Sequence, residues 1–378
     1  MNDLRFQELN SIKEDTGISL YLSITPSIGK KEILNITKKL IESVKDEVNI
    51  EEREIFERSK ENLLNYLEGM RVKGKSLFVF SSLKNIYEFF YEFPLRNEIF
   101  FGKPNLYQFY WAQIEYPDFG IVNFTESKFS FYKVIFFKEK LIFEEEPKID
   151  TSTWKRKHIM PPSAPKSGVG IGAVGGGDLK DAYEEKYTLF IEKALSDFKE
   201  KVLKDSDELK VIFVNSDAEE NIYMFLNVPP PSQKFLKLNA PSNVTINEII
   251  LLGIKKLEEI NKNKEREILN TLFERASTSN LAGVGLDSTL KILQDGRVDK
   301  LIISENINRL VKICKSCSYF YTERESCPVC NTKEYELKNI RFYIHELCKK
   351  YKSELTILHG NEAKELDLND GIGSLWRF

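Results

Sequence analysis

Two pairs of cysteines are the residues whose type and spacing make the clearest chemical prediction in this chain. Cys314 and Cys317 are separated by two residues, as are Cys327 and Cys330, and nine residues lie between the pairs. A CxxC turn lets two thiolates bind one ion, and a second turn facing it completes a tetrahedral four-sulfur site, the preference of structural zinc. The alternative, four unliganded thiols, would leave only a short aromatic run to hold this segment. We therefore predict a structural zinc ion, because a closed four-sulfur site has no open position for catalysis.

A basic cluster in front of a glycine-rich loop is the second segment with a chemical signature. The basic residues are Lys155, Arg156, Lys157 and His158, with Lys166 further along. Residues 161–177 contain almost nothing that favours a helix or a strand, so we expect a mobile loop there. Asp178 is a good helix N-cap, and apolar residues at helical spacing follow it as far as Val202. Basic side chains beside loop amides suit a polyanion such as RNA, where phosphate contacts dominate the affinity.

Other interpretations of the glycine loop are weaker. Gly170, Gly172 and Gly175 match GxGxxG, but that pattern indicates a dinucleotide site only directly after a strand, and PPSAPKS precedes it here. A phosphate-loop match fails because no GK[ST] follows the glycines. A surface loop without function is the remaining alternative, and the basic cluster at its base argues against it.

Composition and charge limit the class of protein. With 378 residues, of which 42% are hydrophobic, the chain is long enough for two or three domains with buried cores. No stretch approaches the roughly 18 to 20 uncharged apolar residues of a membrane span, and the N-terminus has no export signal. The net charge of −3 means that any nucleic-acid contact must come from local patches. We therefore expect a cytoplasmic protein that makes no membrane contact.

Apolar periodicity predicts a mixed α/β (α+β) fold with three domains. In the first, residues 1–117, strands are expected at 18–24 and 76–80, helices between 31 and 70, and short aromatic strands from there to the domain's end. The second, residues 118–240, combines a three-strand meander at 119–145 with the glycine loop and a long helix. It ends in a proline-rich linker at 227–243, since consecutive prolines do not fit a helix interior or a central strand.

The third domain, residues 241–378, is predicted to be an α/β layer with the cysteine segment inserted into it at about 312–338. Thr245 and Glu248 have the spacing of a capping box, and apolar residues at helical spacing follow. The fifth cysteine, Cys348, lies on the apolar side of an expected helix, where packing is its expected role. His345 and His359 give no signal for ligation or catalysis.

The order of these segments resembles the class 1 release factor superfamily of archaea and eukaryotes, which includes Pelota, the bacterial-type relatives and the hibernation factor Balon. The likeness is carried by TGISLYLSI, FGIVNFTESKFSFYKV, RKH before a glycine loop and long helix, GVGLDSTLKILQDGRVDKLIISEN, the CxxC pairs and GIGSLWRF. The resemblance implies that the third domain docks on the ribosome or on a translational GTPase. It also implies that the glycine loop reaches toward the peptidyl-transferase region, in contact with rRNA or tRNA.

Two departures limit what this resemblance implies. Release factors keep a Gly-Gly-Gln tripeptide at the loop tip, whereas this chain has Gly175, Gly176, Gly177 and Asp178. An aspartate carboxylate near a developing oxyanion would oppose the stabilisation that ester cleavage needs. The Asn-Ile-Lys-Ser element of codon-reading domains is also missing, and ITPSIGKKEI stands at the comparable place. These departures predict that classical stop-codon termination has been lost.

We therefore predict a release-factor-like, zinc-containing translation factor that binds the ribosome in hibernation or rescue, with no catalytic residue. The alternative is a peptidyl-tRNA hydrolase that frees nascent chains from stalled ribosomes or large subunits, with Gly175, Gly176, Gly177 and Asp178 at its active loop tip. An RNA-processing adaptor that never meets a ribosome is a third interpretation. The identity of a GTPase partner and of the ribosomal state stays open.

Overall fold

The computed structural model describes residues 16–24, 28–45, 48–91, 93, 95–125, 128–135, 137–146, 177–198, 200, 209–216, 234–238, 240, 244–279 and 281–378. Contacts divide the chain into two compact units, Met1–Pro117 together with Ile254–Phe378, and Asp118–Gly253. The mixed α/β fold class expected from the sequence is confirmed, with separate sheets in both units. The division into three domains at 117 and 240 stays a prediction.

An antiparallel four-stranded sheet of order β3-β2-β1-β4 organises the N-terminal part of the first unit. Its strands are β1 (Gly17–Ser23), β2 (Ser76–Ser82), β3 (Ile86–Tyr91) and β4 (Glu98–Gly102). β2 is buried along its whole length and β1 along nearly all of it, because both faces of the sheet are covered.

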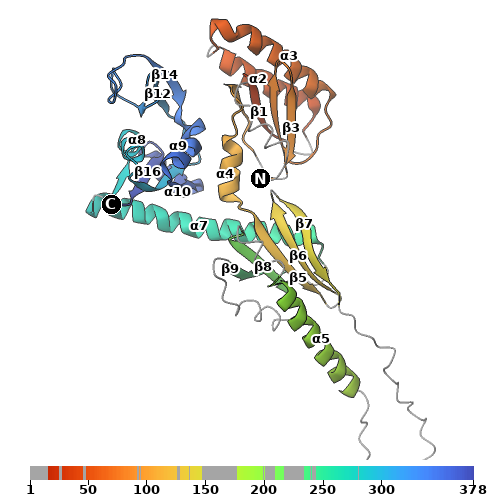
Figure 1. Ribbon diagram of the computed structural model, residues 1–378. Helices are drawn as coiled ribbons and strands as arrows, with labels where there is room; N and C mark the ends of the chain where they lie inside the picture. The colour runs from red at the N-terminus through yellow and green to blue at the C-terminus, as the bar shows by residue number, and fades with distance from the viewer. Residues whose placement is uncertain are drawn as a thin grey trace, which may run out of the picture. The chain divides into compact units, whose positions relative to one another are not determined.

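The two faces of this sheet are covered by different helices (Figure 1). Helices α2 (Lys30–Lys45) and α3 (Arg53–Gly69), joined through the 3₁₀ turn Ile50–Glu52, share a core with the aliphatic residues of the strands. On the other face, aromatic rings of β1 and β2 pack against helix α4 (Tyr107–Glu115). The alternation of side chains along a strand thus separates an aliphatic layer from an aromatic one.

Helix α4 corrects one expectation from the sequence. The aromatic run LYQFYWAQIEY predicted a strand, but residues 107–115 form a helix with five buried side chains. A helix that is apolar on nearly all sides is a buried helix, and the strand preference of aromatic residues depends on packing context. Burial against the sheet therefore outweighs the local preference.

A five-stranded sheet of order β7-β6-β5-β8-β9 forms the second unit. Its strands are β5 (Phe119–Thr125), β6 (Lys128–Ile135), β7 (Lys138–Glu145), β8 (Val211–Ser216) and β9 (Lys234–Lys237). The predicted meander corresponds to β5, β6 and β7, which pair antiparallel. Strands β8 and β9 join in parallel, so β9 is a strand inside the segment that the prolines predicted to be linker throughout.

Helix α5 (Gly177–Phe198) follows the glycine loop and packs on this sheet through its C-terminal half. Ile191, Ala194, Leu195 and Phe198 lie at helical spacing and are buried against strand residues such as Phe131. The helix begins at Gly177, so Asp178 stands in its first turn and not at the N-cap position. A one-residue shift of a helix start is within the spread of boundary definitions.

The C-terminal part of the first unit has a mixed sheet of order β10-β16-β11-β15. Its strands are β10 (Ala282–Val284), β11 (Val298–Ser304), β15 (Glu354–Leu358) and β16 (Ile372–Trp376). The helices of this part are α8 (Leu286–Gln294), α9 (Ile344–Tyr351) and α10 (Gly360–Asp367), with a 3₁₀ turn at Ile340–Phe342. β11 and β15 are parallel neighbours although about fifty residues separate them in sequence.

Helix α7 (Ile246–Thr278) is one continuous helix of 33 residues. The predicted capping box at its start is confirmed: the Thr245 N–H donates to Glu248 Oε2 at 2.8 Å, and the Glu248 N–H donates back to Thr245 Oγ1 at 3.4 Å. Its Leu272 packs on β16 so closely that a Cβ on Gly373 would lie 2.6 Å from Leu272 Cδ2. Within the described residues, no helix is both long and apolar enough to cross a membrane.

Candidate metal centre

The four cysteines lie in a small three-stranded ribbon that interrupts the C-terminal sheet between β11 and β15. Its strands are β12 (Leu310–Cys314), β13 (Phe320–Tyr321) and β14 (Tyr335–Asn339), in the antiparallel order β13-β12-β14. The first CxxC turn joins β12 to β13, and the second lies between β13 and β14. Strand pairing therefore brings the two turns to the same end of the ribbon.

The two CxxC turns have the same backbone design. In the first, the Ser318 N–H donates to the Cys314 carbonyl at 2.9 Å; in the second, the Asn331 N–H donates to the Cys327 carbonyl at 2.9 Å. Ser318 and Asn331 both have φ of +58°, in the left-handed region. An uncommon conformation that recurs at equivalent positions indicates a constraint imposed by the shared ligand geometry.

A second pair of hydrogen bonds repeats in the same way. The Cys314 N–H donates to the Tyr319 carbonyl at 3.0 Å, and the Cys327 N–H donates to the Thr332 carbonyl at 2.9 Å. In each turn, both the carbonyl and the N–H of the first cysteine are therefore hydrogen-bonded within the turn. This arrangement brings the two sulfur atoms of the motif close together.

The four sulfur atoms form one cluster, which confirms the predicted grouping. All four lie within 4.8 Å of one another. The Sγ–Sγ distances are 3.5 Å for Cys314 and Cys330, 3.4 Å for Cys317 and Cys327, and 3.6 Å for Cys317 and Cys330. Four zinc–sulfur bonds of about 2.3 Å in a tetrahedron place sulfur atoms about 3.8 Å apart. The cluster therefore fits a four-coordinate metal ion, and zinc is the ion that we propose.

Burial differs within each pair of cysteines, and the ribbon has little hydrophobic core of its own. The first cysteine of each turn, Cys314 or Cys327, is buried, whereas the second is exposed. A small hydrophobic cluster in the ribbon consists of Cys314, Cys327 and Tyr321, with Tyr319 packed against it, and Val311 and Phe320 are the further buried apolar residues of its described strands. A core of this size cannot offset the conformational entropy of ordering a segment of nearly thirty residues. Metal binding supplies such small modules with their folding free energy.

Gln294 at the end of α8 attaches the ribbon to the α/β layer. Its Nε2 donates to the Phe320 carbonyl, and its Oε1 accepts from the Phe320 N–H, both at 2.8 Å. The amide thus pairs with β13 as a neighbouring strand would. Thr322 adds a second attachment through a hydrogen bond from its Oγ1 to Asp287 Oδ1 at 2.5 Å. No sequence pattern singled out Gln294, because a glutamine at a helix end is common.

The ionisation of Cys330 suits a metal ligand. Hydrogen bonds from the Thr332 side chain and backbone lower the pKa of its thiol to about 6. The thiolate is the form that binds a metal, so Cys330 is available as a ligand at neutral pH. Cys348 is different, because burial raises the pKa of its thiol to about 12 and it packs in α9 as predicted.

The other predicted site lies mostly outside the described residues. Lys155, Arg156, Lys157, His158 and Lys166 fall there, as do Gly175 and Gly176. The described chain resumes at Gly177 and Asp178, the first residues of α5. The first N–H groups of any helix have no partner within the helix and carry a partial positive charge. The end of the predicted loop thus coincides with a run of backbone donors.

His359 has a role that its sequence context did not reveal. Its Nδ1 lies 3.0 Å from Glu265 Oε1, and its Nε2 lies 2.9 Å from Glu115 Oε1. Both ring nitrogens face carboxylate oxygens, so both must carry protons, which only the imidazolium form allows. Burial would lower the pKa of His359, but the hydrogen bonds to Glu115 and Glu265 together outweigh it and raise the pKa to about 10. The ion ties the end of α4 to α7 and to the start of α10.

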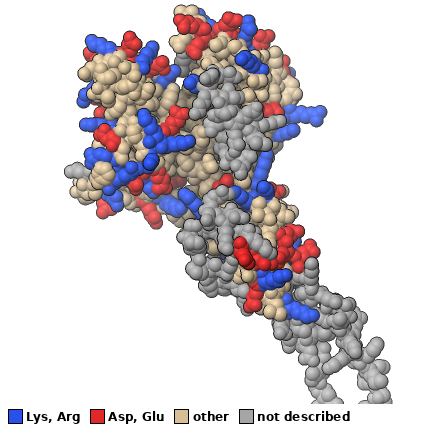
Figure 2. All heavy atoms as spheres, viewed as in Figure 1, with Lys and Arg blue, Asp and Glu red and all other residues tan. Residues whose placement is uncertain are grey.

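Acidic and basic side chains are interspersed over the described part of the face shown in Figure 2. The pattern agrees with the near-neutral net charge of −3. A large field of one sign is the usual mark of sequence-independent polyanion binding. The basic cluster at 155–158 therefore remains the segment with the clearest electrostatic signal for RNA.

No protein-family model and no curated protein match the chain. Among solved structures, an archaeal translation termination factor, aRF1, is 13% identical with a TM-score of 0.25, and the match covers 99% of this chain and 97% of that one. Dom34 of S. cerevisiae, a translation termination-like factor that interacts with Hbs1, is 13% identical with a TM-score of 0.38 over 80% of each chain. The C-terminal domain of a peptide chain release factor from Methanosarcina mazei is 17% identical with a TM-score of 0.28, covering 37% of this chain and 98% of that one.

These neighbours come from the superfamily that the sequence blocks resemble.

Proposed function

We propose that this chain is a release-factor-like translation factor that binds the ribosome and acts in hibernation or rescue without classical termination. The observation that carries the proposal is the place of the metal-binding ribbon. It interrupts a C-terminal α/β layer between the parallel neighbours β11 and β15, directly after the block GVGLDSTLKILQDGRVDKLIISEN. This is the order of segments on which the resemblance to release factors rests.

The loop sequence supports a binding role over a catalytic one. Asp178 stands in the first turn of α5, next to the three glycines. Its carboxylate is favourable beside the positive end of the helix and so reduces the field that would stabilise an oxyanion there. Retention of the loop with loss of the glutamine fits a factor that occupies the peptidyl-transferase region without cleaving an ester.

Co-sedimentation with ribosomal particles through a sucrose gradient tests this proposal. We expect the protein in ribosomal fractions, with an affinity that falls as salt rises, because phosphate contacts release counterions. Reversing charge at Lys155, Arg156 and Lys157 should move the protein to the top of the gradient. The matched control reverses the exposed Lys31, Lys38 and Lys39 of α2 and should leave binding unchanged. Absence of the unmodified protein from ribosomal fractions of both growing and stationary cells would contradict the proposal.

A peptidyl-tRNA hydrolase is the second candidate, and the start of α5 at Gly177 is the observation that favours it. The first N–H groups of a helix have no partner within the helix, so next to a glycine loop they are potential oxyanion donors. A release assay on ribosomes loaded with peptidyl-tRNA separates the two functions. We expect background hydrolysis by the unmodified chain and a measurable gain for Asp178→Gln, which removes the negative charge and adds an amide. Hydrolysis by the unmodified chain that is lost in Gly176→Ala would instead establish the enzyme.

The identity of the partners is part of the same proposal. The resemblance points to rRNA, and to tRNA in the peptidyl-transferase region, as the RNA contacts, and to a translational GTPase at the C-terminal domain. A solved structure of ribosome-bound archaeal Pelota contains ABCE1, and Dom34 interacts with Hbs1. Crosslinking followed by sequencing of the bound RNA distinguishes ribosomal contacts from those of an RNA-processing adaptor.

A further inference from the structure

The metal-binding ribbon has two edges, and only one of them is closed. Its strand order β13-β12-β14 places β13 at one edge and β14 at the other. The edge of β13 is closed by the Gln294 side chain, which donates to and accepts from the Phe320 backbone. Within the described residues, no strand pairs with the outer side of β14. An open edge presents N–H and C=O groups that can pair with another strand, and the proposed function makes no use of it.

The hydrogen bonds at the two ends of β14 identify the backbone groups that face outward. The Lys315 N–H donates to the Glu334 carbonyl at 3.1 Å, and the Ile340 N–H donates to the Arg309 carbonyl at 2.9 Å. Both bonds continue the register in which β14 pairs with β12. In an antiparallel pair, successive residues direct their backbone groups alternately toward the neighbouring strand and away from it. The residues whose backbone groups face the open edge are therefore Tyr335, Leu337 and Asn339.

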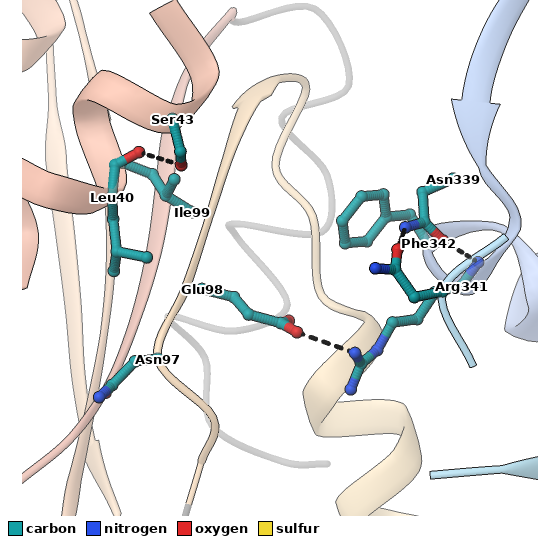
Figure 3. Close-up of a pocket in the computed structure, with 9 residues that line it drawn as sticks. Leu40, Ser43, Asn97, Glu98, Ile99, Asn339, Arg341 and Phe342 are labelled. Carbon is teal, nitrogen blue, oxygen red and sulfur yellow. Dashed lines mark hydrogen bonds and ion pairs between the residues drawn. The ribbon is translucent and has the colours of Figure 1, made fainter. Parts of the chain in front are cut away.

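Both ends of β14 are held in place within the chain. Figure 3 shows Asn339 at the C-terminal end, where its Oδ1 accepts from the Arg341 N–H at 3.1 Å and its Nδ2 donates to Asn308 Oδ1. At the other end, the Lys312 Nζ lies over the Tyr335 ring, 4.9 Å from its centroid. A strand that is already ordered loses little conformational entropy when a partner binds.

The two faces of the ribbon carry different side chains at this edge. Leu337 lies opposite Lys312 and Asn339 lies opposite Leu310, so the two leucines share one face. Their exposed fractions are 65% for Leu310 and 55% for Leu337, and covering them would remove apolar area from water. The other face carries an acidic and a basic residue of β14, Glu336 and Lys338.

We propose that β14 pairs antiparallel with β14 of a second copy of this chain. A twofold axis at Leu337 places Leu337 opposite Leu337 of the partner subunit, and Tyr335 opposite Asn339 of the partner subunit. Each pair that exchanges hydrogen bonds then consists of outward-facing residues, as the ladder requires. In the same register, Glu336 stands opposite Lys338 of the partner subunit, and the symmetry repeats this pair. The charges of the strand YELKN thus complement those of a second copy running in the opposite direction.

Charge also favours this register over its neighbours. Because only the outward-facing residues can exchange hydrogen bonds, one copy can shift along the other only in steps of two residues. A shift in one direction brings Glu336 opposite Glu336 of the partner subunit, and a shift in the other direction brings Lys338 opposite Lys338 of the partner subunit. Like charges directly opposite each other are destabilising. Charged side chains protect many edge strands from pairing, but here the two signs attract each other in the twofold arrangement.

Sedimentation velocity of the full-length protein, from a few to several hundred micromolar, tests the proposal. A single pair of short strands buries less than a standard interface of about 1,600 Å², so we expect a weak dimer that forms as concentration rises. Glu336→Lys or Lys338→Glu should each abolish dimerisation, because each places like charges opposite each other. Glu325→Lys makes the same charge change as the first variant at an exposed ribbon position outside β14, and should dimerise like the unmodified protein.

Mixing the two single variants tests the register itself. Glu336→Lys and Lys338→Glu should each be monomeric alone, and an equimolar mixture should form a heterodimer, because the new lysine of one chain meets the new glutamate of the other. Leu337→Pro removes an N–H that faces outward and not one that bonds to β12, so it should abolish dimerisation while the metal content stays unchanged. A monomer at every concentration, a dimer that survives both charge variants, or a mixture that stays monomeric overturns the proposal.

Discussion

The metal-binding ribbon and the N-terminal sheet are held together by opposite means. The ribbon has three short strands, and its few buried apolar residues include two cysteines, Tyr321, Val311 and Phe320. The N-terminal sheet buries an aliphatic layer on one face and rings such as Tyr21, Phe78 and Phe109 on the other. Hydrophobic burial maintains the sheet, whereas we propose that metal coordination by the four cysteines maintains the ribbon. We therefore expect each region to unfold under a treatment that leaves the other region folded.

Metal removal should have the largest effect and should be confined to the ribbon. Cys327→Ser removes a fully buried ligand, and a strong zinc chelator removes the ion itself. Structural zinc contributes about 10 to 16 kcal/mol in isolated fingers, far more than this ribbon's core supplies. We expect loss of one bound zinc per chain and loss of amide protection in residues 310–339, with β1 and β2 still protected.

Zinc analysis and hydrogen exchange measure both outcomes of metal removal. Cys348→Ala is the matched control, because it deletes a buried thiol of the same part of the chain that does not belong to the cluster. Full protection of the ribbon after chelation would show that its strands hold without the ion.

Truncating a side chain of the aromatic layer should destabilise the N-terminal sheet and leave the ribbon intact. Phe78 is fully buried and lies 5.1 Å from the Phe109 ring and 4.7 Å from the Tyr21 ring, measured between ring centroids. Phe78→Ala should lower the free energy of unfolding by about 3 to 5 kcal/mol, through lost burial and the cavity left behind. Urea unfolding followed by tyrosine and tryptophan fluorescence gives the value. Zinc content should stay at one per chain, and its loss would argue against the independence of the two regions.

Gln294→Ala should loosen the ribbon without releasing its metal. The substitution removes both hydrogen bonds between the Gln294 side chain and Phe320. Two buried backbone groups lose their partner, at a cost of about 1 to 3 kcal/mol. Hydrogen exchange at β13 should become faster while zinc is retained. Gln294→Glu is an informative companion, because it keeps the acceptor for the Phe320 N–H but loses the donor.

The smallest effect expected is the pH dependence that comes from His359. Its pKa is raised to about 10 in the folded chain from an unfolded value of 6.5, so its contribution is fully present below pH 6.5 and is lost as pH rises through 10. With more than a third of the side chain exposed, we expect about 1 kcal/mol. His359→Gln should flatten the fall in stability between pH 7 and 10, as measured by urea unfolding.

His345 affects the stability of the fold over a different pH range and provides a comparison for His359. Burial lowers its pKa to about 4, and its ring stacks on Tyr110 at 3.8 Å. The unfolded chain therefore binds more protons between pH 4 and 6.5, and His345 makes stability rise with pH in that range. An unchanged slope between pH 7 and 10 in His359→Gln would mean that the two carboxylates do not hold the imidazolium in solution.

Residue spacing and periodicity predicted the structure correctly where it depends on residues close together in the sequence. The CxxC spacing predicted the cluster because a short turn brings two thiols together whatever surrounds it. The capping box at Thr245 and Glu248 and the meander at 119–145 were also correct, since each depends on neighbours in sequence. Helix α4 was predicted incorrectly, because the partner that decides its conformation is the aromatic face of a sheet made by distant strands.

The amino-acid sequence by itself determined which four cysteines cluster, where the capped helix begins and that the loop tip ends in Asp178. Only the tertiary structure decided that β11 and β15 are parallel neighbours around an inserted ribbon, that Gln294 holds this ribbon and that His359 lies between Glu115 and Glu265. The physical reason is the range of the interactions. Turns, caps and chelating pairs form within a few residues, whereas ion pairs and cavity walls need surfaces that meet only after the chain has folded.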